Sequence, residues 1–245
     1  MKDNFSTQSD KYAQYRPTYP SGLYDYIQSL VPSRINAWDC GTGNGQVAYQ
    51  LSTLFEQVYA TDISQAQLDN AQRSHNIHYS LQAAEQTTFP EAFFDLIIVA
   101  QAIHWFDFDK FYKEVKRTLK PNGYLVIVGY NRLNITPEID ELITDFYTNI
   151  IGVYWDKERH YIDEAYKTIP FPLNEIEAPF LQNTFDWTFE HLIGYLGTWS
   201  AVKHYITAKG HNPIELIHDE LQILWGDATT RPVYFPILLR VGMHL

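Results

Sequence analysis

Residues 39–45, with the sequence DCGTGNG, decide the fold class of this 245-residue chain. Three glycines stand at alternate positions, directly after the short run 34–38. Glycine adopts backbone angles that other residues resist, and it lets the backbone come close to a ligand. A glycine turn at the first strand–helix junction of an α/β unit is where such folds hold nucleotide-like cofactors. The stretch therefore predicts an α/β fold with a cofactor site at this turn.

Strand and helix signals alternate around the turn. Apolar runs predict strands at 35–38, 58–60, 77–81, 96–99 and 125–128. Helical spacing follows the glycine turn at Val47, Leu51 and Leu54. Ser64 is a suitable N-cap for a second helix, and Asp107 stands near the start of a third, which stops before a turn at 121–123. This alternation predicts a parallel sheet with helices on both faces.

The second half of the chain is less regular. Helical patterns are expected at 137–147, 189–199 and 213–225, whereas 150–180 has no clean period. Residues 233–241 read as a closing strand, in which Pro236 implies an edge position or a bulge. We expect one domain over 1–245, with a core sheet at about 30–130, 171–187 and 229–245. Inserted segments at about 131–170 and 188–228 are expected to form a helical cap over the site.

Composition limits the partners. A formal net charge of −11 argues against nucleic acid, because phosphate binding needs a basic surface. The single cysteine, Cys40, excludes an internal disulfide and a thiolate metal cluster. His75 and His78 have no carboxylate or cysteine nearby in the sequence that could complete a metal site, so no metal is expected. With no apolar signal segment or membrane-length run, a cytoplasmic protein without membrane contact, monomeric or homodimeric, is the expectation.

The register of the glycines separates two cofactors. The dinucleotide fingerprint is G-x-G-x-x-G, but the third glycine here falls one place early. An acidic residue also precedes the first glycine by two positions, which gives the pattern D-x-G-x-G-x-G. This pattern resembles motif I of class I S-adenosylmethionine (SAM) methyltransferases. A nicotinamide-dependent oxidoreductase with a Rossmann fold remains the alternative.

The resemblance implies a seven-stranded, mostly parallel Rossmann-like sheet and SAM as the cofactor. Asp39 would reach toward the ammonium side of SAM, and Asp62 would accept its ribose hydroxyls. Glu85 would face the adenine, and Gln101 would line the pocket. The full set of cofactor-binding residues that the resemblance implies is Arg16, Asp39, Gly41, Gly43, Gly45, Asp62, Ile63, Ala84, Glu85 and Gln101.

Four further segments are similar to trans-aconitate methyltransferase-like enzymes, of the methyltransferase type 11 family. They are 12–20, 101–108, 153–155 with Arg159, and 195–201. This resemblance covers nearly the whole chain and implies methyl transfer to a carboxylate of a small, anionic organic acid. Another oxygen or nitrogen nucleophile on a small molecule, and a SAM-binding protein without catalysis, remain open.

A carboxylate is already a nucleophile at neutral pH, so its methylation needs positioning rather than a general base. Cations would hold the acidic groups of the substrate, and arginine suits carboxylates because it binds them in a bidentate manner. The predicted catalytic residues are His104, Trp105 and Arg159. Further candidates around the substrate are Arg16, His204, Tyr154 and Trp199, and Arg16 could instead bind the carboxylate of SAM. His104 would act as the base for a hydroxyl or amine substrate. Arg159 could instead form an ion pair with Asp156 or Asp163.

Overall fold

The computed structural model describes residues 15–245. Its centre is an eight-stranded sheet with the order β3-β2-β1-β4-β5-β8-β6, and β7 pairs with β8. The strands are β1 (Asn36–Cys40), β2 (Gln57–Asp62), β3 (Ile77–Leu81), β4 (Phe94–Ala100), β5 (Leu119–Tyr130), β6 (Asn174–Ile176), β7 (Gln182–Trp187) and β8 (Arg231–Met243). The first five are parallel and the last three antiparallel to their neighbours. The Rossmann-like α/β fold is thus confirmed.

The described part of the sheet has eight strands rather than the expected seven, because its outer strand is split. Positions 174–176 pair with 241–243 of β8, and positions 182–187 pair with 231–236. The closing strand β8 therefore lies between β5 and this split strand, and Pro236 belongs to its first half, 231–236, which pairs with β7 but not with β5. Pro236 stands just before Ile237, where pairing with β5 begins, so its missing N–H falls beyond the last pair of that ladder.

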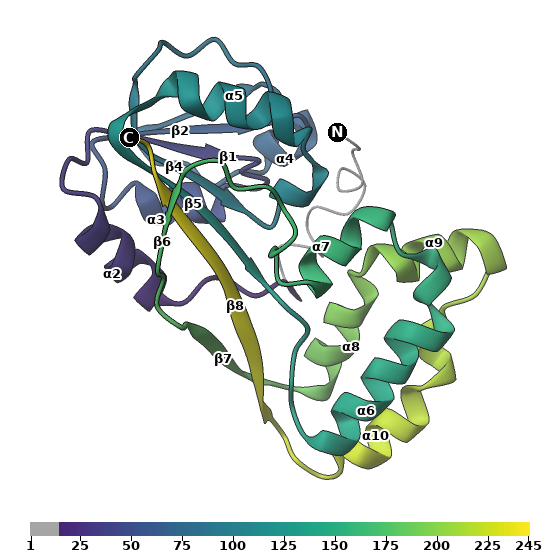
Figure 1. The fold of residues 1–245 in the computed structure, drawn as a ribbon. Helices are drawn as coiled ribbons and strands as arrows, with labels where there is room; N and C mark the ends of the chain where they lie inside the picture. Colours follow the sequence, from purple (N-terminus) through teal and green to yellow (C-terminus); the bar gives the residue numbers. More distant parts are fainter. Residues whose placement is uncertain (1–14) are drawn as a thin grey trace.

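Helices cover both faces of the sheet (Figure 1). Helices α2 (Ser21–Leu30) and α3 (Gln46–Leu51) share one apolar cluster with alternate residues of the central strands, such as Leu96 and Ile98. On the other face, α5 (Phe108–Thr118) packs against Ile97 and Val99. Alternate strand residues point to opposite faces, so a run buried throughout, as in β4, requires a layer on each side.

Local signals set the helix starts. The Ser64 hydroxyl accepts from the N–H of Gln67 at the start of α4 (Gln65–Asp69), and the Asp107 carboxylate accepts from the N–H of Lys110 at the start of α5. Both N-caps agree with the sequence prediction. The predicted turn at 121–123 lies inside the span of β5, where the register against β4 shifts and Asn122 has φ 61°.

The remaining helices gather beside the sheet, at the lower right of Figure 1. They are α6 (Pro137–Asp145), α7 (His160–Asp163), α8 (Phe189–Gly197), α9 (Ser200–Lys209) and α10 (His218–Trp225), with short 3-10 or π turns at Phe146–Ile150, Gly152–Tyr154, Lys157–Arg159 and Pro213–Leu216. Buried residues of this group, such as Leu196 and Trp225, belong to the same apolar cluster as Leu96 of the sheet. The sequence patterns missed α2 and α9.

Candidate active site

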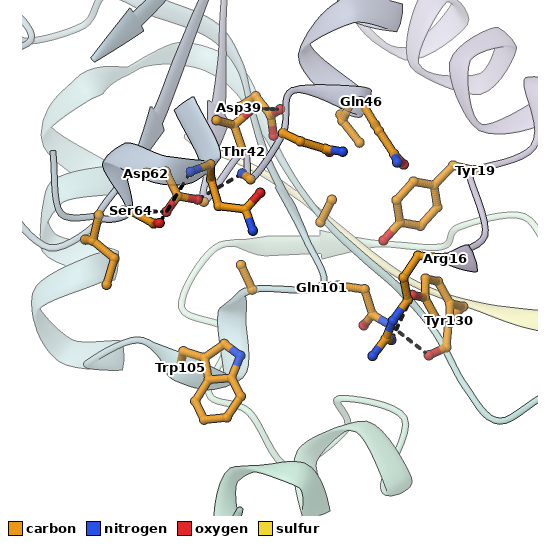
Figure 2. Close-up of a pocket in the computed structure, with 18 of the residues that line it drawn as sticks. Arg16, Tyr19, Asp39, Thr42, Gln46, Asp62, Ser64, Gln101, Trp105 and Tyr130 are labelled. Atoms are coloured by element: carbon orange, nitrogen blue, oxygen red, sulfur yellow. Dashed lines mark hydrogen bonds between the residues drawn. The ribbon is translucent and has the colours of Figure 1, made fainter. Parts of the chain in front are cut away.

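A pocket opens where β1, β2 and β4 end, beside the glycine turn (Figure 2). The carboxyl ends of parallel strands are where open α/β sheets bind ligands. Of the predicted site residues, those that line this pocket are Arg16, Asp39, Gly41, Gly43, Asp62, Ile63, Gln101 and Trp105. The pocket is also lined by four residues that the sequence did not mark as candidates: Tyr19, Thr42, Gln46 and Tyr130.

The glycine turn is held in a conformation that side chains resist. Gly41, Gly43 and Gly45 have φ values of 73°, 55° and 79°. A Cβ atom on Gly41 would lie 2.8 Å from the Cβ atom of Ala102, which leaves no space for a side chain. The N–H groups of Gly41 and Thr42 both donate to the carbonyl of Thr61 at 2.9 Å, which fixes the turn to β2. At Gly41, glycine is therefore required by both backbone angle and space.

Asp39 is a buried carboxylate at the edge of the pocket. Its Oδ2 accepts from the Thr42 hydroxyl at 2.6 Å, while its Oδ1 is buried with no hydrogen-bond partner within residues 15–245. Burial raises the pKa of Asp39 from 3.8 to about 7, although the bond from Thr42 offsets part of this rise. A buried carboxylate oxygen without a donor is costly unless a ligand supplies one, and a cationic ammonium fits that requirement.

Asp62 follows β2 and holds the turn from the other side. Its Oδ2 accepts from the N–H of Gly43 and its Oδ1 from the N–H of Ser64, each at 2.9 Å. The carboxylate thus joins the glycine turn to the start of α4. Each carboxylate oxygen can accept more than one hydrogen bond.

Three predicted cofactor residues do not line the pocket: Gly45, Ala84 and Glu85. Gly45 precedes α3, and a Cβ atom there would lie 2.2 Å from the Tyr79 hydroxyl. Ala84 is buried in the core. The Glu85 carboxylate accepts from the N–H of Asp107 at 3.1 Å, next to the start of α5.

A second, smaller pocket adjoins the first. Arg16, Gln101 and Trp105 line both pockets, whereas His104 and Arg159 line only the second. The structure therefore brings the three predicted catalytic residues together. Trp155 and Ser200 also line this second pocket, but Tyr154, Trp199 and His204 line neither. Trp199 is only 2% exposed and packs in the core against Phe146.

Arg16 joins the two pockets to the helices beside the sheet. Its Nη1 donates to the Tyr130 hydroxyl at 3.1 Å, as Figure 2 shows, and its Nη2 to the carbonyl of Thr198 at 3.3 Å. Arg16 belongs to the segment 12–20, which is one of the four segments similar to trans-aconitate methyltransferase-like enzymes. Residues 12–14 of that segment lie outside the described residues.

His104 is 6% exposed, and its Nδ1 lies 3.5 Å from the Tyr166 hydroxyl. Burial lowers the pKa of His104 from 6.5 to about 3, and the positive charge of Arg159 adds to this effect. Loss of water disfavours the charged imidazolium, and a nearby cation does the same. The ring is therefore neutral at physiological pH.

The polar contacts of the Arg159 side chain within the described residues are made by its Nε atom. Its Nε donates to the Tyr147 hydroxyl at 2.9 Å and lies 3.7 Å from Oδ1 of Asp163. Its guanidinium carbon lies 4.9 Å from the centre of the Trp155 ring. Of the two ion pairs considered from the sequence, the structure has the one with Asp163. Nη1 and Nη2 have no hydrogen-bond partner within residues 15–245, so they can serve an anion.

Two further properties concern the described residues as a whole. No group of three His, Cys, Asp or Glu side chains within 15–245 is arranged to hold a metal ion. None of the helices in this range combines the length and apolar character that a membrane crossing requires.

Comparisons with known proteins show the family of this chain. Residues 38–127 match the family described as "Methyltransferase domain". A Dictyostelium discoideum protein named as a methyltransferase is 34% identical over 97% of this chain and 93% of its own. A structure described as a type II methyltransferase from Anaeromyxobacter dehalogenans is 36% identical, covers 94% of this chain and 98% of its own, and has a TM-score of 0.87.

The fold also matches more distant proteins with the cofactor product bound. A phosphoethanolamine N-methyltransferase 2 from Haemonchus contortus, in complex with S-adenosylhomocysteine (SAH), has a TM-score of 0.51 at 19% identity. That match covers 98% of this chain and 57% of the other. At this identity the match concerns the fold alone. The matched family domain and the two relatives above 30% identity show that this chain belongs to the SAM-dependent methyltransferases.

Proposed function

We propose that this methyltransferase transfers the methyl group of SAM to a carboxylate of a small organic acid bound in the second pocket. The observation that carries the proposal is Arg159, whose Nη1 and Nη2 have no partner within the described residues and whose side chain lines this pocket. The similarity of four sequence segments to trans-aconitate methyltransferase-like enzymes supports an acid as well.

The first pocket has the features that SAM requires. The unpartnered Oδ1 of Asp39 offers a negative charge for the ammonium group, and the glycine turn lets the backbone approach it. We propose that Asp62 accepts the ribose hydroxyls. Bound SAM supplies the methyl group as an electrophilic carbon on a sulfonium, with a neutral thioether as the leaving group.

The chain contributes mainly position and charge. Gln101 and Trp105 line both pockets, so an acid held by Arg159 would stand next to the cofactor. Holding two reactants close and in line replaces a bimolecular step by an effectively intramolecular one. The sheet and the helices beside it would act as one catalytic domain, because the second pocket combines Gln101, which directly follows β4, with Arg159 and Ser200 from the helical segments.

A hydroxyl or amine acceptor would need a base, and His104 is the candidate in the second pocket. The lowered pKa of about 3 makes this imidazole a poor proton acceptor. A carboxylate needs no proton removal. The state of His104 therefore favours the acid over a hydroxyl or amine.

The test is product analysis by mass spectrometry with isotope-labelled SAM and a panel of small acids, amines and phenols. We expect methyl esters of at least one acid. Methylation of an amine or phenol without methylation of any acid would contradict the carboxylate proposal.

Arg159→Gln gives a second test with a matched control. Loss of a charged hydrogen bond should raise KM for the acid by about 10- to 100-fold and leave the Kd of SAH within about twofold. Arg132 also lies over the Tyr147 ring, at 4.9 Å, but does not line the second pocket. Arg132→Gln should therefore leave KM unchanged, and equal effects of the two variants would count against substrate binding by Arg159.

A further inference from the structure

Tyr166 contacts Gln101, which lines both pockets, and His104, which lines the second; nothing in the sequence marked it as a candidate. The side chain is fully buried, and its ring lies so close to β5 that a Cβ atom on Gly129 would be 2.8 Å from its hydroxyl. Tyr166 has φ 60°, which is a left-handed conformation uncommon outside glycine. The surrounding structure must therefore hold this residue in place.

The anchor is Arg240 of β8. Its Nη1 donates to the carbonyl of Tyr166 at 2.8 Å and to the carbonyl of Ile169 at 2.7 Å. The same guanidinium forms a bidentate pair with Glu175 of β6, at 2.7 and 2.8 Å. Paired, planar contacts of this kind fix geometry as well as adding stability.

The hydroxyl of Tyr166 stands between Gln101 and His104. It lies 2.9 Å from Oε1 of Gln101 and 3.5 Å from Nδ1 of His104. Gln101 itself has φ 53°, and its side-chain amide donates to the carbonyl of Tyr130 at 3.2 Å. Four groups therefore form a hydrogen-bonded chain. In order, they are the carbonyl of Tyr130, the side-chain amide of Gln101, the hydroxyl of Tyr166 and the imidazole of His104.

The carbonyl at one end gives this chain a direction. A carbonyl only accepts, so the Nε2 amide of Gln101 must face Tyr130 and its Oε1 must accept. The Tyr166 O–H supplies the proton for that bond, which leaves only lone pairs on its oxygen. The contact with His104 is then favourable when Nδ1 carries the proton.

We infer that Tyr166 is a positioning residue that keeps His104 in the tautomer with the proton on Nδ1 and a lone pair on Nε2. The partner of one ring nitrogen decides the state of the other. Nε2 has no hydrogen-bond partner within residues 15–245, so it can accept a hydrogen bond from a hydroxyl or a protonated carboxyl group of the bound acid, but not from the ionised carboxylate that takes the methyl group. This catalytic consequence rests on the proposed function, whereas the tautomer itself does not.

The tautomer can be measured without any methyl acceptor. Two-bond 15N–1H correlation spectra distinguish the protonated ring nitrogen of a neutral histidine, and His104→Gln identifies the signal by its loss. We expect a proton on Nδ1 in the wild-type protein. In Tyr166→Phe we expect a marked shift toward protonated Nε2, because the oxygen that accepts from Nδ1 is gone.

Tyr112→Phe is the matched control. Tyr112 belongs to the same apolar cluster, and its buried hydroxyl has no hydrogen-bond partner within the described residues. Its removal should leave the His104 spectrum unchanged. An unchanged spectrum in Tyr166→Phe would overturn the inference.

If Tyr166→Phe does not fold, Gln101→Leu answers the same question. The Tyr166 O–H then loses its acceptor and can turn to Nδ1, which should again move the histidine proton to Nε2. The wild-type tautomer in this variant would contradict the directed chain.

The kinetic consequence is separate. With an acid from the panel that also carries a hydroxyl or protonated carboxyl group to donate to Nε2, Tyr166→Phe should lower kcat by about tenfold, the effect of one hydrogen bond, with the Kd of SAH within about twofold. A purely structural role would lower Tm without this kcat effect, and that result would contradict positioning. If every acid fails in the panel but the tautomer shifts, the inference about Tyr166 stands and the proposed substrate does not.

Discussion

At the scale of single residues, ionisation of Asp39 lowers the free energy of unfolding of the ligand-free protein. Its pKa is raised to about 7 by burial, so the folded state binds a proton that the unfolded chain has released above about pH 4. The free energy of unfolding must then fall as the pH rises through this window. We predict that Asp39→Asn is more stable than the wild type at pH 8 by roughly 2–4 kcal/mol, with little difference near pH 4.

Urea unfolding curves at several pH values measure this difference. Thr42→Val is a useful companion, because it removes the hydroxyl that donates to Oδ2 of Asp39. It should enlarge the loss of stability at high pH. Parallel pH profiles for the wild type and Asp39→Asn would show that burial does not raise the pKa of this carboxyl.

The same carboxyl predicts how cofactor binding depends on pH. A cationic ammonium beside Oδ1 favours the ionised form, so SAM should bind more tightly as Asp39 loses its proton. We expect the Kd to fall roughly tenfold between about pH 5.5 and about pH 7.5, measured by calorimetry. Asp39→Asn corrects for the titration of the cofactor itself. A Kd that varies equally in both proteins would place the ammonium elsewhere.

At the scale of elements, the junction of the glycine turn with α3 has a specific steric requirement. Gly45 has φ 79°, and an added Cβ atom would lie 2.2 Å from the Tyr79 hydroxyl. Gly210, at the end of α9, has φ 80° but no atom within 4 Å of such a Cβ atom. The two glycines share the backbone angle and differ in the space around them.

We predict that Gly210→Ala lowers the free energy of unfolding by about 1–2 kcal/mol, the cost of the left-handed backbone. Gly45→Ala should cost about 1–3 kcal/mol more, because the methyl group displaces Tyr79. Chemical denaturation of both variants provides the comparison. Equal losses would mean that Tyr79 moves away at no cost, and that only the backbone angle requires glycine here.

Elements whose formation depends on residues close in the sequence were predictable. The glycine turn, the N-caps Ser64 and Asp107, and the continuous apolar run of β4 each depend on neighbouring residues. Helix α9 was missed because its sequence, SAVKHYITAK, has no clear apolar stripe. The split outer strand was not predictable either, because it depends on how 174–187 meets β8 in three dimensions.

The same limit applies to the candidate site. Gln101 could be selected from its place after an apolar strand within a family pattern. Tyr166 could not, because it reaches Gln101 across 65 positions of the sequence and nothing local marks it. Tyr130 lies two positions beyond the predicted strand 125–128, and only the folded sheet places its hydroxyl beside Arg16. Only tertiary contacts therefore reveal the positions of these two tyrosines.

At the scale of the whole molecule, the sheet and the surrounding helices share one apolar core. The cluster that contains Leu96 of β4 also contains Leu196 of α8 and Trp225 of α10. Because burial of this shared cluster stabilises both parts at once, neither part should unfold alone. We predict a single cooperative transition, in which far-ultraviolet circular dichroism and tryptophan fluorescence coincide.

Leu196→Ala makes that prediction quantitative. Leu196 is fully buried, so its truncation should lower the free energy of unfolding by about 2–5 kcal/mol. If the core is shared, both spectroscopic probes must shift together, even though the mutation lies in α8 and the sheet is untouched. Ile223→Ala, in α10, is the control, because Ile223 is 78% exposed and its truncation removes little buried surface. A fluorescence transition that separates from the circular dichroism transition in Leu196→Ala would divide the chain into two units, and both pockets would then lie at a domain boundary.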